Sequence, residues 1–224
     1  MKRGMAVLWA ALACCILISI RHGDALYVNY QPQPVYGGAY GASLMFNVYQ
    51  NTEQVEQILD ILDAYGVKAS FFIGGVWAQD NQELVKRIHD EGHDVGNHGY
   101  LHKLPTKAGP ETTAAEIRRT NALLEQITGA PVTLYAPPSG DFDSDTASIA
   151  AQEGCLTILW SADTIDWRDQ DAGLITDRAL TKTQEGGFLL MHPTQATVQA
   201  LPGIIDGLRE KNLLLIPVSQ SLAE

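Results

Sequence analysis

Cysteine is scarce in this chain, with three among 224 residues, and two of them stand together in an apolar stretch near the N-terminus. Cys155 is the one cysteine in the remainder of the chain, so that part has no second thiol with which to form an internal disulfide. Cys155 opens the apolar run "CLTILW", which has the length of a core strand. We therefore expect it to be an inert packing residue.

Basic residues are also in short supply. Asp and Glu outnumber Lys and Arg by 26 to 15, which gives a formal charge of −11. No cluster of basic residues is present to follow a phosphate backbone, so DNA and RNA are not expected partners. Anionic lipid and acidic polymers are poor partners for the same reason, and a neutral or zwitterionic partner fits better. With 46% hydrophobic residues, the chain has enough apolar material for one well-packed domain.

The N-terminal segment differs in kind from the rest. Lys2 and Arg3 precede the run "MAVLWAALACCILISI", which carries no charge over 16 residues. This pattern predicts a secretory signal or a signal anchor over residues 1–25. Membrane anchoring and cleavage near Ala25 both remain open, and either one places the following domain outside the cytoplasm. Residues 26–41 are rich in Tyr, Pro and Gly, which indicates a linker ahead of a domain at 42–224.

Beyond residue 41, short apolar runs alternate with amphipathic stretches of helical spacing, which predicts parallel strands joined by right-handed crossovers. We expect seven strands in an α/β fold, as a distorted, incomplete (β/α)7 barrel. The expected strands are 42–48, 67–75, 93–96, 131–136, 155–160, 187–192 and 213–219. The expected helices are 52–66, 80–92, 111–128, 144–153, 171–184 and 195–210.

Polar residues gather at the ends of these expected strands. The motifs are "NV" at 47–48, "HGYLH" at 98–102, "APPSG" at 136–140, "DTIDW" at 163–167 and His192. In β/α barrels the C-terminal ends of the strands meet at one mouth, where active sites are built. His98 and His102 are four residues apart and could share one metal ion, but a hydrolytic zinc site normally has a third protein ligand.

In this order the motifs resemble those of the polysaccharide deacetylases, carbohydrate esterase family 4, also called the NodB-homology domain. The resemblance covers about residues 42–221. It is carried by "VKASFFIGG", "LVKRIHDEGHDVGNHGYLH", "APPSG", "DTIDW" and "LMHPT", and it looks most like the subgroup found in spore-forming bacteria. The family's fold matches the one expected from the alternation.

The resemblance implies roles for particular residues. The family holds a divalent metal, usually zinc, with two His and one Asp, and His98 and His102 match the two histidines. His192 matches the general acid that protonates the leaving amine, with Asp166 as its supporting carboxylate. Ser139 would offer its backbone N–H to the oxyanion.

Three positions depart from the family pattern. The family has a T-F-D-D motif at the end of the first strand, where one Asp is the general base and the other a metal ligand. Here "MFNV" puts Asn47 at the base position and Val48 at the third-ligand position, and Ala136 replaces the Arg that orients the base. We therefore expect zinc binding to be weak or absent and activity to be lost or much reduced. The segment "DFDSD" at 141–145 is more consistent with a helix N-terminal cap than with a substitute ligand cluster, although Asp141 is near enough to the site in sequence to replace the lost Asp.

The flat faces of Trp167, Pro137, Pro138 and Tyr100 suit a groove for sugar rings. One hypothesis is a non-catalytic protein of the bacterial cell envelope that binds N-acetylated glycan, such as peptidoglycan or a chitin-like polymer. The alternative is a weak metal-dependent N-deacetylase acting on the same glycans. A scaffold that uses only the outer surface of the domain is a third possibility.

Overall fold

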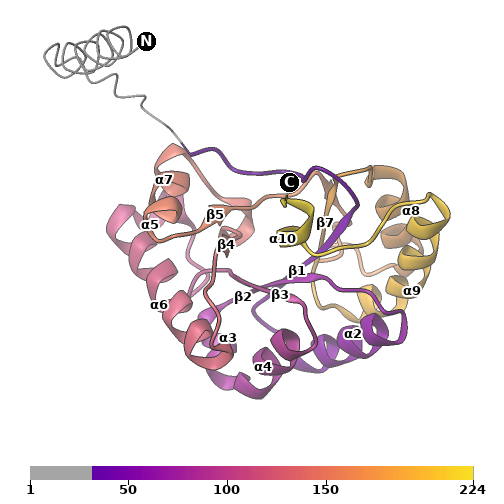
Figure 1. Cartoon of the computed structure of the whole chain (residues 1–224), viewed down its shortest axis with the longest axis horizontal. Helices are drawn as coiled ribbons and strands as arrows, with labels where there is room; N and C mark the ends of the chain where they lie inside the picture. Colours follow the sequence, from indigo (N-terminus) through magenta and orange to yellow (C-terminus); the bar gives the residue numbers. More distant parts are fainter. Residues whose placement is uncertain (1–31, 224) are drawn as a thin grey trace, which may run out of the picture. The chain divides into compact units, whose positions relative to one another are not determined.

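A computed structural model describes residues 32–223 of the chain. Within them, seven strands form one sheet in the order β5-β4-β3-β2-β1-β7-β6, and every strand pairing is parallel. This arrangement confirms the incomplete β/α barrel (Figure 1). The strands are β1 Ser43–Val48, β2 Ser70–Ile73, β3 Asp94–Asn97, β4 Leu134–Tyr135, β5 Leu156–Thr157, β6 Ala162–Asp163 and β7 Phe188–Met191.

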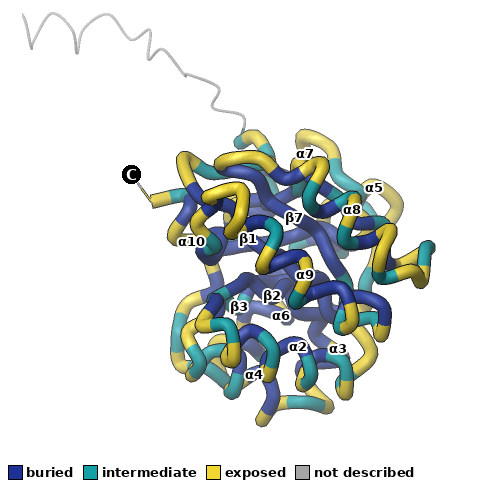
Figure 2. The backbone as a smooth tube through the Cα atoms, turned by 90° about the vertical axis from the view of Figure 1, so that its right-hand side faces the viewer, coloured by how far each residue is buried: buried dark blue, intermediate teal, exposed yellow. Residues whose placement is uncertain are grey.

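Helices cover the outside of this sheet, so the strands are buried and the yellow, exposed residues lie mainly on helices and loops (Figure 2). The described helices include none that is long and apolar enough to cross a membrane. The predicted signal or anchor segment lies outside the described residues. The helices are α2 Thr52–Ala64, α3 Gly75–Asp80, α4 Gln82–Asp90, α5 Pro105–Ala108, α6 Pro110–Thr128, the 3₁₀ turn η1 Pro138–Gly140, α7 Ser144–Gln152, α8 Ala172–Lys182, α9 Gln195–Glu210 and α10 Val218–Ser221.

Strand β1 lies in the middle of the sheet, and all six of its residues are buried. Because side chains alternate along a strand, Leu44, Phe46 and Val48 join the core cluster that contains the buried faces of α2 and α9. Met45 joins a second cluster inside the barrel, formed with residues of β2, β4 and β7. Asn47 points the same way as Met45, and it lies at the mouth.

One predicted strand is not formed, and one observed strand was not predicted. The run "LLLIPVS" at 213–219 makes a single bridge, from Leu215 to Ala42, and then turns into α10. The sheet still has seven strands because β6, a two-residue strand that was not predicted, follows shortly after the predicted strand 155–160. A strand of two residues carries no readable periodicity, whereas the closing run is apolar because part of it is buried as irregular chain. "DTIDW" therefore spans the end of β6, and His192 follows β7.

Residues 32–41, expected to be part of a linker, pack against the barrel instead. The Val35 N–H donates to the Thr157 carbonyl at 2.8 Å, and the Gly38 N–H donates to the Gly186 carbonyl at 2.8 Å. The segment thus joins the end of β5 to the loop before β7. These two contacts lie on opposite sides of the opening between β5 and β6, the outermost strands of the sheet. The folded unit therefore begins before residue 42.

The close packing of this segment predicts that Gly38→Ala lowers the stability of the fold. A Cβ at Gly38 would overlap the hydroxyl and the carbonyl of Ser221, which is fully buried and whose hydroxyl donates to the Tyr40 carbonyl. We expect a loss of about 1–3 kcal/mol in the free energy of unfolding, measured by urea titration.

Gly203→Ala is the matched control, because Gly203 lies inside α9 and the nearest atom to its added Cβ is 3.7 Å away. That change should raise stability by about 0.5–1 kcal/mol, since it removes backbone freedom from the unfolded chain. If Gly38→Ala proved as stable as the wild type, residues 32–41 would be a loosely attached linker after all.

Candidate functional site

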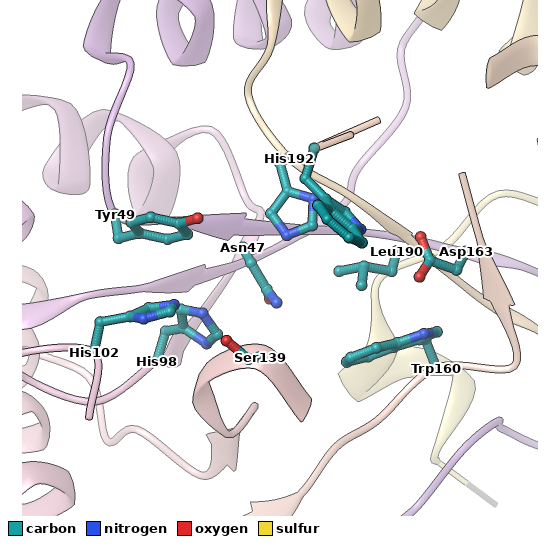
Figure 3. A pocket seen from close by; sticks show the side chains of 10 residues that line it. Asn47, Tyr49, His98, His102, Ser139, Trp160, Asp163, Leu190 and His192 are labelled. Carbon is teal, nitrogen blue, oxygen red and sulfur yellow. The ribbon is translucent and has the colours of Figure 1, made fainter. Parts of the chain in front are cut away.

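One cavity, of about 360 Å³, opens at the mouth formed by the C-terminal ends of the strands (Figure 3). Its lining brings together residues that are up to 145 positions apart, as the strand-end pattern predicted. The lining residues are Asn47, Tyr49, His98, His102, Ser139, Trp160, Asp163, Trp167, Leu190 and His192.

His98 follows directly after β3, and its ring is fixed by a hydrogen bond to the chain after β4. The His98 Nδ1 lies 2.7 Å from the Ala136 carbonyl oxygen, which accepts its proton. This contact leaves Nε2 as the ring atom free to bind a ligand. The His102 ring stands edge-on to it, with ring centroids 5.0 Å apart. Figure 3 shows both rings on the same side of the cavity.

Burial keeps both imidazoles neutral. It lowers the pKa of His98 to about 3, and the nearby His102 adds to that effect. Burial also lowers the pKa of His102. Neutral imidazole is the form that gives a lone pair to a metal, so the pair has the right protonation state for metal binding at neutral pH.

The remaining donors of a metal site are missing around this pair. Asn47 faces the cavity, 2% exposed, and its Oδ1 has no hydrogen-bond partner. The Val48 side chain does not line the cavity, because it belongs to the buried core on the helix side of β1. Tyr49 takes the place beside the histidines instead, and its ring centroid lies 4.3 Å from that of His102.

The described residues therefore fit a metal only in part. No group of three or more His, Cys, Asp or Glu side chains within residues 32–223 could hold a metal ion. Two neutral nitrogens, without a carboxylate to balance the charge, fall short of the three-ligand set of hydrolytic zinc sites.

His192 is held by a fully buried carboxylate on the other side of the cavity. Its Nδ1 lies 2.8 Å from Asp166 Oδ1, and its backbone N–H donates to Asp166 Oδ2 at 2.6 Å. The Thr197 hydroxyl donates to the same Oδ2 at 2.6 Å. This arrangement matches the expected support of His192 by Asp166. It keeps a proton on Nδ1 and leaves Nε2 to exchange a proton with a ligand.

The turn that carries Asp166 is strained. Ile165 has φ +57°, in the left-handed region that β-branched residues rarely adopt. Asp163 Oδ1 accepts a hydrogen bond from the Ile165 N–H at 2.7 Å, which stabilises this turn. The turn directs Asp166 towards His192 and leaves Asp163 and Trp167 in the cavity lining. Backbone strain of this kind is common at functional sites.

Ser139 lines the cavity at the end of "APPS", also with a positive φ, of +58°. Asp141, next to it, is used elsewhere: its two carboxylate oxygens accept hydrogen bonds from the Thr106 N–H and hydroxyl, at 2.8 and 2.9 Å. Asp141 is therefore tied to α5 rather than available as a substitute base. Asp143 caps α7, accepting a hydrogen bond from the Thr146 N–H at 2.8 Å.

Three of the four predicted sugar-contacting residues do not line the cavity. Pro137 and Pro138 directly precede Ser139 in the sequence, and both are buried. Tyr100 is 5% exposed, its hydroxyl donates to Gln79, and the Arg119 guanidinium lies 3.5 Å from its ring centroid. Its ring fills space over α3 rather than facing a ligand. Trp167 is the exception, since it lines the cavity and is 58% exposed.

The sequence analysis missed other residues of the lining. Tyr49 comes directly after β1, so the same strand-end reasoning could have found it. Trp160 ends the apolar run "CLTILW" and was assigned to the core with that run. Leu190 lies within β7, and its position became visible only once that strand was placed in the sheet.

Comparison with known proteins gives the family context. Residues 39–158, more than half of the chain, match the family model of polysaccharide deacetylases. The chain is 34% identical to the uncharacterized protein YlxY of Bacillus subtilis, over 88% of this chain and 62% of that protein. It is 33% identical to a peptidoglycan-N-acetylglucosamine deacetylase of Bacillus cereus, over 75% of this chain and 63% of that protein. The chain thus spans less than two thirds of these two relatives.

Among solved structures, the fold is similar to that of a CE4-family pseudoenzyme from Bacillus anthracis. The TM-score is 0.84 at 33% identity, over 88% of this chain and 71% of that one. A mutant of that pseudoenzyme, described as having restored enzymatic activity, is similar at a TM-score of 0.84 and 32% identity, over 88% of this chain and 73% of that one.

The contacts of Asp166 predict that its removal costs stability. Asp166→Ala removes the buried carboxylate that accepts hydrogen bonds from the His192 ring, the His192 N–H and the Thr197 hydroxyl. We expect a loss of about 1–3 kcal/mol in the free energy of unfolding. Asp177→Ala, at an exposed position of α8, should stay within about 0.5 kcal/mol of wild type. Equal stabilities for the two variants in urea titration would show that Asp166 does not hold His192.

Proposed function

This chain belongs to the polysaccharide deacetylase family, and we propose that it binds N-acetylated glycan of the bacterial cell envelope with lost or much reduced deacetylase activity. The observation that supports the loss is Asn47, a buried amide in the cavity beside the two histidines. An amide does not accept a proton from water at neutral pH. The absence of a general base costs about 10²–10⁴-fold in rate.

The retained parts of the cavity support binding. The exposed indole of Trp167 offers a flat face for a sugar ring, and Trp160 adds a second indole to the lining. His192, with Nδ1 bound to Asp166, presents Nε2 as a donor or acceptor to a sugar or an amide. Ser139 is the proposed source of a backbone N–H for a carbonyl oxygen. A cell-wall polymer as ligand agrees with the export predicted from the N-terminal segment.

A divalent metal, when bound, would polarise an N-acetyl carbonyl and acidify a water molecule. In this proposal His98 and His102 would hold it, weakly, because no third protein ligand joins them among residues 32–223. The chain's own groups would then supply orientation of the sugar and a proton from His192. What they do not supply is a base.

The second candidate function is a weak metal-dependent N-deacetylase on the same glycans. The intact pairing of His192 with Asp166 favours it, because that pairing is what a proton donor to the leaving amine needs. The argument against this second candidate is the general base, for which neither Asp141 nor Asp163 is well placed. Asp141 is bound to Thr106, and Figure 3 shows Asp163 on the side of the cavity away from the two metal-binding candidates.

The proposal predicts binding without turnover. Isothermal calorimetry of the wild-type chain with N-acetylglucosamine oligomers should show binding that Trp167→Ala weakens. Acetate release from the same oligomers with added zinc should stay at background. The triple variant Asn47→Asp, Val48→Asp, Ala136→Arg should raise acetate release by about 10²-fold or more, and Asn47→Asp alone by much less, because base and metal act as one unit.

The structure adds a control for folding. Asn47→Asp is nearly isosteric, whereas Val48 and Ala136 are fully buried in apolar clusters, so the triple variant should unfold at lower urea than wild type. Adding His192→Ala to the triple should remove the gained activity. Wild-type acetate release as fast as that of the triple would identify an active enzyme. A folded but silent triple would show that a side chain at position 48 does not reach the metal in this barrel.

A further inference from the structure

The charge of the cavity differs from what the family pattern implies. Asp163 is the only residue with a formal negative charge among the described residues that line it, and none of them is Lys or Arg. Position 136, where the family resemblance implies an Arg, is a fully buried Ala. A second carboxylate, Asp166, lies directly behind His192. No Lys or Arg therefore lines the cavity beside Asp163; Arg168 interacts electrostatically with Asp163 from outside the lining, while its guanidinium is ion-paired with Asp169.

The carboxylate of Asp163 is only partly used by the protein. Its Oδ1 accepts the Ile165 N–H, and no Lys, Arg or His of the described chain forms an ion pair with it. Lys182, which lies nearby, reaches the backbone carbonyl of Asp163 instead, at 3.4 Å. Oδ2 therefore remains to accept a hydrogen bond from a ligand.

Aromatic side chains complete this part of the lining. Figure 3 shows Trp160 and Asp163 together on one side of the cavity, away from His98 and His102. The Trp160 ring packs closely against Gly140, where an added Cβ would lie 2.5 Å from the ring. Indole faces attract ammonium groups through their quadrupole, and a carboxylate accepts a charge-assisted hydrogen bond from them.

We propose that Asp163 and Trp160 bind the ammonium group of an amino sugar that has already lost its N-acetyl group, so that the preferred ligand is partly deacetylated glycan. This inference rests on the proposed glycan binding and narrows it. A neutral acetamide would gain no charge attraction from a carboxylate that lacks an ion-pair partner, whereas a free sugar amine is protonated at mildly acidic pH and would gain it. The reaction that must supply this ligand is hydrolysis of N-acetyl groups on the same polymer, which a separate N-deacetylase performs. The protein would thus recognise the product of its active relatives.

The test compares two ligands of equal length, glucosamine oligomers and N-acetylglucosamine oligomers. Affinities are measured by isothermal calorimetry on the full chain, at about pH 6, where the free amine carries a proton. A chelator in the buffer removes free divalent metal ions, so that no metal cation changes the charge of the cavity. Wild type should bind the glucosamine oligomer about tenfold more tightly, which is the contribution of one charge-assisted hydrogen bond. Asp163→Asn should abolish this preference while retaining affinity for the N-acetylated oligomer.

Asp163→Asn is a conservative change, because the amide oxygen can still accept the Ile165 N–H. Asp177→Asn on the exposed face of α8 removes the same charge outside the cavity and should keep the tenfold preference, which separates specific binding from general attraction to an acidic protein. Equal affinities in wild type, or a preference that survives Asp163→Asn, would overturn the inference and leave glycan binding standing. If neither oligomer bound, the proposed function would fail together with it.

Discussion

The alternation of side chains along β1 is the constraint on which the core and the cavity both depend. This strand has a hydrogen-bonded neighbour on each side, so one face must fill the barrel and the other must pack under the helices. Phe46 and Val48 point to the helix side, and Met45 and Asn47 to the interior. The last interior position of the strand is thus the natural place for a reacting group, and in this chain it carries an amide.

The losses and the retained groups divide the site into two halves. His192, Asp166 and Thr197 form a complete hydrogen-bonded unit on the β7 side, and its geometry needs nothing from β1. On the β3 side, the Ala136 carbonyl still orients His98 and Tyr49 packs over His102, but no carboxylate of the described part of the chain accompanies the histidines. Within residues 32–223, Asn47, Val48 and Ala136 stand where the family resemblance implies two Asp and one Arg, while His192 and Trp167 remain in the cavity lining. A cavity of this kind is better suited to binding than to hydrolysis.

The sequence predicted the alternation of strands and helices, the gathering of polar residues at one mouth and the pairing of His192 with Asp166. The first two features depend on local periodicity and on the geometry of parallel strands, which short segments of sequence encode, whereas the pairing of His192 with Asp166 was implied by the family resemblance. It did not predict β6, because two residues carry no period, or the packing of residues 32–41, because a segment rich in Tyr, Pro and Gly reads as irregular whether or not it is bound. Tyr100 lies outside the cavity lining for a different reason: an aromatic next to a site histidine can face the cavity or the core, and here Arg119 and Gln79 contact its buried ring.

Zinc binding to the full chain, followed by isothermal calorimetry, tests the central claim most directly, because the claim is that the metal half of the site has lost its carboxylate while the histidine pair remains. The account predicts a dissociation constant in the micromolar range or weaker, and loss of the binding signal in both His98→Ala and His102→Ala. A nanomolar dissociation constant would contradict it, since that affinity would require a full ligand set that the two histidines and Asn47 do not provide. An affinity that His102→Ala leaves unchanged would contradict it as well, since zinc would then bind without the histidine pair.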